Sequence, residues 1–170
     1  RDYQLEGFHH ALSYKKSLLV SPTASGKSLI IYLIVRALNV KTLIIVPTTS
    51  LVSQLYTDFQ EYGWDSAKYC HQVYAGQDKV SDKLVVISTW QSIYKLQKKI
   101  FEPYKLVIGD EAHGFKSKSL TSIMTKCVNA EYRVGTTGTL DGTQTHKLVL
   151  EGLFGKVYKV TTTKKLIDQK

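Results

Sequence analysis

Cysteine is scarce in this chain, which has only Cys70 and Cys127 among its 170 residues. The two cysteines lie far apart, and neither has a CxxC companion or a histidine at the spacing of a zinc site. This pattern argues against a disulfide framework and against a zinc module, and it favours a reducing compartment.

Long apolar runs are also missing. No stretch approaches the roughly 18 uncharged apolar residues of a membrane-spanning helix, and the opening residues 1–3 do not begin a secretory signal. The sequence contains no internal repeat and no low-complexity tract. We therefore expect a soluble, cytoplasmic protein, and the lack of an initiator methionine suggests an excerpt from a longer one.

Acidic residues are few relative to basic ones. There are 14 Asp and Glu against 23 Lys and Arg, which gives a formal charge of +9. Such an excess favours a polyanionic partner, either nucleic acid or an acidic membrane surface. Many ordinary proteins also have a basic surface, so the charge alone does not decide between these interpretations.

Strand-like and helix-like segments alternate along the chain. Short, almost continuously apolar runs predict buried strands at 18–20, 42–46, 84–87, 106–108, 132–134 and 157–160. Helix-like segments lie at 3–14, 28–38, 50–62, 91–98 and 120–128, and a loop is predicted at 74–83. These patterns predict an α/β fold of one compact domain, with a doubly wound parallel sheet, helices on both faces and ligands at the carboxyl ends of the strands.

A phosphate loop is indicated by residues 21–28, which match GxxxxGK[ST] except at the first position, where Ser21 replaces glycine. A predicted strand precedes the loop and a predicted helix follows it. We expect Lys27 to bind the β and γ phosphates and the Ser28 hydroxyl to ligate Mg²⁺. Backbone N–H groups at the helix start would cradle the phosphates, with these residues around them: Thr23, Ala24, Ser25 and Gly26. The alternative is a Ser/Gly turn that only caps a helix.

Two adjacent acids follow the predicted strand 106–108. Asp110 is placed to hold a metal ion, and Glu111 is placed to orient and deprotonate an attacking water. A strand that ends in Asp-Glu is common, but together with an upstream phosphate loop it predicts the second acidic motif of an NTPase. His113 by itself would be an ordinary surface or core histidine.

With these motifs in place, the chain resembles superfamily-two helicases over nearly its whole length. Residues 110–113 read Asp-Glu-Ala-His, the DEAH form of motif II, and residues 136–139 occupy the place of motif III. The resemblance implies a P-loop NTPase fold of the RecA-like type in three layers. It also implies that residues 1–160 form the first motor domain and that 161–170 lead toward a second RecA-like domain.

The resemblance also implies roles for further residues. Tyr3 and Gln4 would read the adenine, and His113 would join the nucleotide site. Coupling of hydrolysis to domain movement is implied for Thr137, Gly138 and Thr139. Contacts with a nucleic-acid backbone are implied for Pro47, Thr48, Thr49, Ser88, Thr89 and Trp90. For the hydroxyl residues the alternative is helix capping, and for Trp90 packing into the core is favoured over base stacking.

Within the superfamily, residues 152–158 and the threonines at 161–163 are similar to the end of the first motor domain in phage UvsW-type recombination helicases. This similarity implies an ATP- and Mg²⁺-dependent DNA helicase or translocase of recombination and repair, in the cytoplasm of a host cell. An RNA helicase, a restriction-type translocase subunit and an excision-repair relative remain alternatives. A small-molecule kinase or other P-loop NTPase and a non-catalytic nucleic-acid module are further ones.

Overall fold

The computed structural model describes residues 2–21, 26–74, 76–138 and 144–159. The strands are β1 (Lys16–Val20), β2 (Thr42–Val46), β3 (Cys70–Val73), β4 (Val85–Thr89), β5 (Leu106–Gly109), β6 (Tyr132–Thr137) and β7 (Val157–Lys159). The helices are α1 (Asp2–Tyr14), α2 (Lys27–Leu38), α3 (Thr49–Glu61), α4 (Ser66–Tyr69), α5 (Trp90–Ile93), α6 (Lys98–Phe101), α7 (Ser117–Lys126) and α8 (Gln144–Phe154), with a 3₁₀ turn, η1, at Ala112–Gly114.

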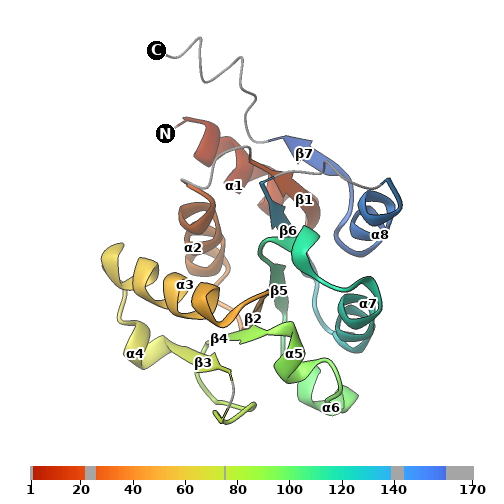
Figure 1. Cartoon of the computed structure of the whole chain (residues 1–170). Coiled ribbons are helices and arrows are strands. Elements are labelled where there is room, and N and C mark those ends of the chain that lie inside the picture. The colour runs from red at the N-terminus through yellow and green to blue at the C-terminus, as the bar shows by residue number, and fades with distance from the viewer. Residues whose placement is uncertain (1, 22–25, 75, 139–143, 160–170) are drawn as a thin grey trace.

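One sheet organises the part of the chain that the structure describes. Its strands run in the order β3-β4-β2-β5-β6-β1-β7, and every neighbouring pair is parallel. In Figure 1, α1, α2 and α3 lie on one side of this sheet, and α5, α7 and α8 lie on the other. The predicted three-layer, doubly wound architecture is confirmed.

Each face of the sheet has its own hydrophobic core. Neighbouring residues of a strand contribute to opposite cores, as Leu43 and Ile44 do in β2. The first core lies beneath α2 and α3 and includes Phe59, whereas the second lies beneath α7 and α8 and includes Phe154. Because both faces are covered, the central strands are apolar throughout, which is why the sequence shows continuous runs instead of alternation.

The predicted helices and strands are confirmed except at two places, 91–98 and 120–128. The segment 91–98 is not one helix, because α5 ends at Ile93 and α6 begins only at Lys98. The amino group of Lys126 on α7 donates to the carbonyls of Tyr94 and Leu96, at 2.9 and 2.8 Å. These carbonyls are therefore satisfied without helical partners, and the chain can turn between the two short helices.

The helix predicted at 120–128 begins earlier, at Ser117, and ends at Lys126. Four further elements were not predicted: β3, α4, η1 and α8. β3 is a four-residue edge strand whose two central residues are half-buried, so it lacks the apolar run that marked the other strands. The predicted loop 74–83 contains neither helix nor strand among its described residues, and the segment 161–170 lies outside the described part of the chain.

None of the helices in the described ranges is long and apolar enough to cross a bilayer. The division into a domain at 1–160 and a following exit segment stays a prediction.

Candidate active site

The candidate site lies where three neighbouring strands end. β6 pairs with β1 on one side and with β5 on the other, so the ends of these strands meet at the carboxyl edge of the sheet. β1 leads toward the phosphate loop, β5 leads into Asp110, and β6 ends at Thr137. The backbone N–H of Ser21 donates to the carbonyl of Thr137 at 2.9 Å, which extends the β1–β6 pairing to the entrance of the loop.

The phosphate loop is described only at its two ends. Thr23, Ala24 and Ser25 lie outside the described residues, and Gly26 precedes α2 with a left-handed backbone at φ 97°. Lys27 is the first residue of α2 and forms a salt bridge with Glu111. Its side chain is only 8% exposed, and burial lowers the pKa of Lys27 despite the opposing charge of Asp110.

Asp110 lies almost completely inside the protein, at 5% exposure. Its Oδ1 atom accepts hydrogen bonds from the Thr136 hydroxyl at 2.6 Å and from the backbone N–H of Glu111 at 3.0 Å. Burial raises the pKa of Asp110, while the bond from Thr136 and the charges of Lys27 and His113 act in the opposite direction. The fixed Oδ1 leaves the second oxygen of the carboxylate for another ligand.

Glu111 has an unusual backbone, with φ 53° in the left-handed region. Side chains other than glycine rarely adopt this conformation, and it is often found where a site requires a particular side-chain direction. Here it turns the chain out of β5 into η1 and directs the Glu111 carboxylate toward Lys27.

His113 joins the acidic motif to the end of β6. Its Nδ1 atom shares a hydrogen bond with the Thr137 hydroxyl at 2.5 Å, and its Nε2 atom lies 3.6 Å from Glu111 Oε2. Burial and the nearby charge of Lys27 lower the pKa of His113, whereas Asp110 opposes this shift. Both lowering effects favour the neutral form of the imidazole. His113 thus connects two motifs that lie 24 residues apart in sequence.

The segment predicted to read adenine also reaches the loop. Gln4 is 8% exposed, and a methyl group at Gly26 would collide with its side-chain amide. The nearest side chain to a methyl group at Gly138 would be Lys27, whose amino group would lie 3.9 Å away. The side chain of Tyr3 and the whole of Thr139 lie outside the described residues. The described members of four motifs therefore meet at one place.

Two contacts in this site were not predicted. The Ser28 hydroxyl shares a 2.6 Å hydrogen bond with the hydroxyl of Tyr62, at the end of α3. Thr136 anchors Asp110 from the neighbouring strand, although only the residues after it had been assigned a role. Tyr62 belongs to no motif, and Thr136 lies in the segment 136–139 without an individual role there. Both partners are distant in sequence, so only the fold could identify these contacts.

The candidate site contains few side chains that could bind a metal ion. Among the described residues no group of three or more His, Cys, Asp or Glu side chains could hold a metal ion. Asp110 and Ser28 supply oxygen atoms, which are the ligands that Mg²⁺ prefers, and Mg²⁺ commonly keeps several of its waters beside one or two protein ligands. The donor set fits Mg²⁺ better than a transition metal.

The residues predicted to contact nucleic acid end two neighbouring strands, β2 and β4, with Val46 opposite Thr89. Thr48 and Thr49 are exposed, and the Gln91 amide donates to the carbonyl of Pro47 at 3.4 Å. Thr48 also caps α3, because its hydroxyl accepts from the backbone N–H of Leu51 at 3.3 Å.

The other members of this group are buried. Ser88 is fully buried, and its hydroxyl donates to the carbonyl of Thr89 at 2.8 Å. Trp90 is 9% exposed and belongs to the second core, so the favoured alternative of core packing is confirmed for it. Thr89 is 4% exposed, and its hydroxyl bonds the hydroxyl of Ser92. The exposed hydroxyls of this edge are therefore mainly those at the start of α3.

Known proteins resemble this chain in sequence and in structure. The family described as type III restriction enzyme, res subunit, matches residues 1–142. The chain is 33% identical to the ATP-dependent DNA helicase uvsW of Enterobacteria phage T4, over 98% of this chain and 35% of that protein. It is 32% identical to the DNA 3'-5' translocase XPB2 of Sulfurisphaera tokodaii, over 82% of this chain and 30% of that protein.

The crystal structure of the UvsW helicase from bacteriophage T4 superimposes with a TM-score of 0.83 at 32% identity, covering 92% of this chain and 58% of that one. The chain thus spans about a third of the two relatives' length, 35% and 30%. The predicted resemblance to superfamily-two helicases of the UvsW type is confirmed, and the chain belongs to the family described as type III restriction enzyme, res subunit.

Proposed function

We propose that this chain is the ATP-binding first motor domain of an ATP-dependent DNA helicase or translocase that acts in recombination or repair. The observation that carries the proposal is the contact of Lys27 with Glu111 beside the buried Asp110, at the edge where the phosphate loop ends. The similarity to a phage helicase and an archaeal translocase supports DNA as the partner. A second RecA-like domain, following residues 161–170, would complete the motor.

In this proposal Lys27 exchanges partners during the reaction cycle. Without nucleotide its ammonium neutralises Glu111, so the base is occupied. The β and γ phosphates of ATP are stronger anionic partners, and they would draw Lys27 toward the loop. Glu111 would then be free to orient a water and accept its proton. A lysine that releases the base only when phosphates arrive limits hydrolysis to the loaded site.

Mg²⁺ would be held by Asp110 and Ser28, and it would neutralise charge on the phosphates. Thr136 keeps the Asp110 carboxylate in one orientation for this task. The Ser28 hydroxyl must first leave Tyr62, since it can turn toward only one partner. The buried Asp110 is costly without a cation, so nucleotide and metal would relieve the cost of its burial.

Further residues would complete the nucleotide-binding site. Tyr3 and Gln4 would contact the adenine, and His113 would lie beside Glu111. The phosphates would be surrounded by Thr23, Ala24, Ser25 and Gly26. The bond between His113 and Thr137 is the proposed coupling element, with Gly138 and Thr139 following it. A change at the phosphates that moves Glu111 would reach the end of β6 through this one imidazole. The second domain would then respond to movement at the end of β6.

DNA would lie across the ends of β2 and β4. A hollow of about 340 Å³ is lined there by Thr49, Ser50, Ser53 and Tyr74. Hydroxyls and helix-start amides hold phosphates without reading bases, so binding would tolerate any sequence. Pro47, Thr48 and Thr49 would supply the exposed contacts. Ser88, Thr89 and Trp90 would act through the backbone they position, because their side chains are buried.

Replacement of Glu111 tests the proposal. In the protein that contains this chain, Glu111→Gln should lower ATP turnover by about 10²- to 10⁴-fold, the range for loss of a general base, and leave ATP binding in place. The matched control is Glu151→Gln, which removes a carboxylate that pairs with Lys147 on α8. Equal turnover in both variants would remove Glu111 from the mechanism.

The partner is tested separately. ATP turnover should rise with added DNA and should not respond to small hydroxyl compounds. Stimulation by a small acceptor but by no nucleic acid would replace the helicase with a kinase. RNA that stimulates better than DNA would assign the motor to RNA.

A further inference from the structure

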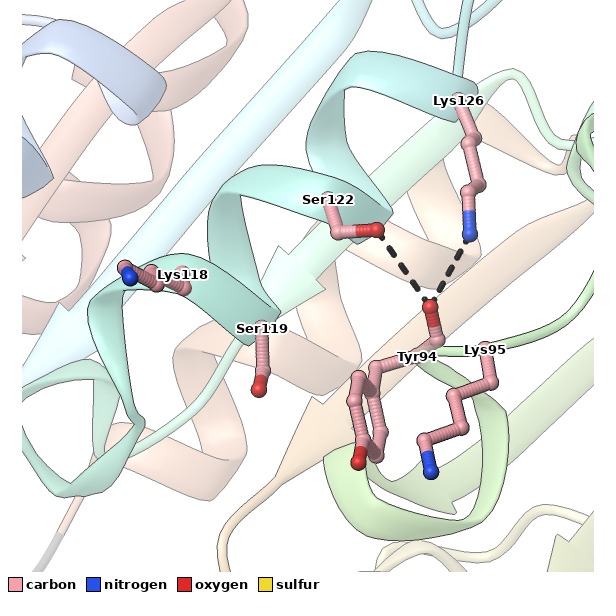
Figure 2. Close-up of a pocket in the computed structure, with 6 residues that line it drawn as sticks. All are labelled: Tyr94, Lys95, Lys118, Ser119, Ser122 and Lys126. Carbon is pink, nitrogen blue, oxygen red and sulfur yellow. Dashed lines mark hydrogen bonds between the residues drawn. The ribbon is translucent and has the colours of Figure 1, made fainter.

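A second hollow, separate from the candidate nucleotide site, lies between α7 and the residues that follow α5 (Figure 2). Its volume is about 360 Å³. The lining residues are Tyr94, Lys95, Lys118, Ser119, Ser122 and Lys126. The lining contains three lysines and three hydroxyl groups and no acidic side chain, so its chemistry suits an anion with several oxygen acceptors.

The three lysines have different duties. Lys126 donates to the carbonyls of Tyr94 and Leu96 and lies over the ring of Phe101, so it holds the floor of the hollow in place. Lys95 and Lys118 are exposed, and within the described residues neither takes part in a salt bridge. Lys95 Nζ lies 5.5 Å from the centre of the Tyr94 ring, but no acidic side chain among the described residues neutralises either lysine, so both charges can act on a ligand. Lys98, Lys99 and Lys116, which are close in sequence to the lining residues, are exposed as well.

Ser119 is the least expected member of the lining. It is only 7% exposed, yet its hydroxyl has no hydrogen-bond partner among the described residues. Figure 2 shows this hydroxyl directed away from α7, on the side where Tyr94 lies. Among the described residues the fully buried side-chain atom without a partner is Ser17 Oγ, so the Ser119 hydroxyl is open to the hollow and can bond a ligand there. A ligand oxygen in the hollow would give it a partner.

The start of α7 adds to the positive character of this place. The ten-residue helix has no acidic residue in its first turn, and no side chain caps its amino end at Lys116. The free N–H groups of a helix start carry partial positive charge and attract anions. Ser119 lies within this first turn, so its hydroxyl and the helix end act on the same space.

We propose that this hollow binds a backbone phosphate of DNA beyond the edge residues of β2 and β4. The inference rests on the proposed function and extends it. α5 is four residues long, so the hollow begins about one helical turn, roughly 5.4 Å, after Thr89. One strand could therefore pass from that edge onto α7. A phosphate fits because the hollow offers two free ammonium groups and an unpaired hydroxyl, and it binds whatever the base sequence.

Removal of the two free charges is the first test. In the protein that contains this chain, the double variant Lys95→Gln, Lys118→Gln should weaken duplex DNA binding on the order of tenfold at low salt. The slope of log affinity against log salt should fall by about 0.9, since the hollow holds one phosphate and each phosphate neutralised in duplex DNA contributes roughly 0.9. The control, Lys16→Gln with Lys156→Gln, makes the same charge change at the amino edge of the sheet, where β1 and β7 begin.

Removal of the hydroxyl is the second test, and it separates a phosphate contact from a general charge effect. Ser119→Ala should weaken DNA binding several-fold with the salt slope unchanged, because a neutral hydroxyl displaces no counterions. Ser119→Thr keeps the hydroxyl and should restore the affinity. Thermal melting of each variant shows whether α7 remains folded, since a purely structural serine would change the melting temperature and leave the salt slope and affinity alone.

The outcomes separate this inference from the proposed function. If DNA still stimulates ATP turnover while the lysine variant matches its control in affinity and slope, the hollow does not hold DNA and the inference is overturned. Competition by polyaspartate as strong as that by DNA would overturn it too, in favour of an acidic protein. Competition by inorganic phosphate as strong as that by DNA would also overturn the inference, and it would assign the hollow to a free anion. If the unmodified protein binds no DNA at all, the proposed function itself fails.

Discussion

Lys27 influences the ionisation of several neighbouring side chains in the candidate site. Its ammonium touches Glu111, and its field reaches Asp110 and His113, whose pKa values it lowers. Lys27 opposes the rise that burial causes in the pKa of Asp110, and it adds to the lowering that burial causes in the pKa of His113. In the proposed function the same side chain would therefore prepare the metal ligand Asp110, the base Glu111 and the coupling residue His113 before any nucleotide binds.

Titration of His113 checks this arrangement. Burial and Lys27 together lower the pKa of His113 from its usual 6.5. Replacing Lys27 with Met removes the cation, so the pKa of His113 should move up toward that value. NMR titration of the imidazole resonances measures the change, and Lys147→Met on α8 is the control. If both variants leave His113 at the same pKa, Lys27 does not act on it.

The same shift has a consequence for stability. The pKa of His113 is lower in the folded protein than the ordinary 6.5 of an unfolded chain. The unfolded state therefore takes up the proton first as the pH falls. The contribution of neutral His113 is complete above pH 6.5 and is lost as the pH falls through the folded-state pKa. Removal of Lys27 should bring the folded-state pKa of His113 closer to 6.5, so the pH interval over which this contribution is lost becomes narrower.

At the scale of elements, α8 packs against the sheet through the ring of Phe154. Phe154 is fully buried and packs on β5 and β6 at two glycines, where a methyl group on Gly109 or Gly135 would lie 2.8 Å from the ring. Gly109 precedes Asp110, and Gly135 precedes Thr136. The ring therefore sits directly behind the two residues that form the buried hydrogen bond of the site.

Truncation of this ring should destabilise the fold. Phe154→Ala is expected to lower the free energy of unfolding by about 3–5 kcal/mol, as for other buried aromatic side chains. Leu148→Ala on the same helix is the control, because Leu148 is 69% exposed and surface changes usually stay within about 0.5 kcal/mol. Denaturant unfolding measures both. A loss below 1 kcal/mol for Phe154→Ala would mean that α8 does not hold this face.

The start of α3 is capped by Thr48 and is proposed to contact DNA, and variants of Thr48 can separate the two roles. Its hydroxyl accepts the N–H of Leu51. Thr48→Ala should cost about 1 kcal/mol of stability through the lost cap. Thr48→Asp keeps a capping oxygen but adds a negative charge, so stability should remain while DNA affinity falls several-fold. Unchanged DNA affinity in Thr48→Asp would leave Thr48 with the structural task alone.

At the scale of the whole molecule, the proposed function makes the candidate site one wall of a larger site. The described residues would supply the phosphate-binding, metal-binding and base groups at an edge of the sheet. NTPases of this kind commonly use an arginine from a facing domain, worth 10³–10⁵ in rate. The chain spans 35% of its phage relative, which leaves ample sequence for such a domain in a protein of that length.

The 170-residue chain by itself should therefore bind ATP weakly and hydrolyse it slowly, with little response to DNA. Turnover of the chain alone, compared with that of the longer protein that contains it, measures the difference with and without DNA. Robust DNA-stimulated turnover by the chain alone would contradict the proposal that the fast step needs groups from elsewhere.

Much of this protein could be predicted from its sequence. Continuous apolar runs indicated the parallel sheet, because strands covered on both faces need no polar side. The phosphate loop and Asp110-Glu111 were placed at one edge, since both follow strands of a parallel sheet. Short elements with mixed composition, such as β3, were missed because their pairing depends on neighbours and not on their own residues.

Other features depended on the tertiary structure. The bond from Thr136 to Asp110, the approach of Tyr62 to Ser28 and the division of 91–98 by Lys126 each join residues 26 or more positions apart. No local pattern encodes such contacts, because they follow from which strands and helices become neighbours. The sequence by itself determined the chemistry available at the phosphate loop. Only the fold decided that Lys27 meets Glu111 and that an unpaired Ser119 faces a basic hollow on the far side of α7.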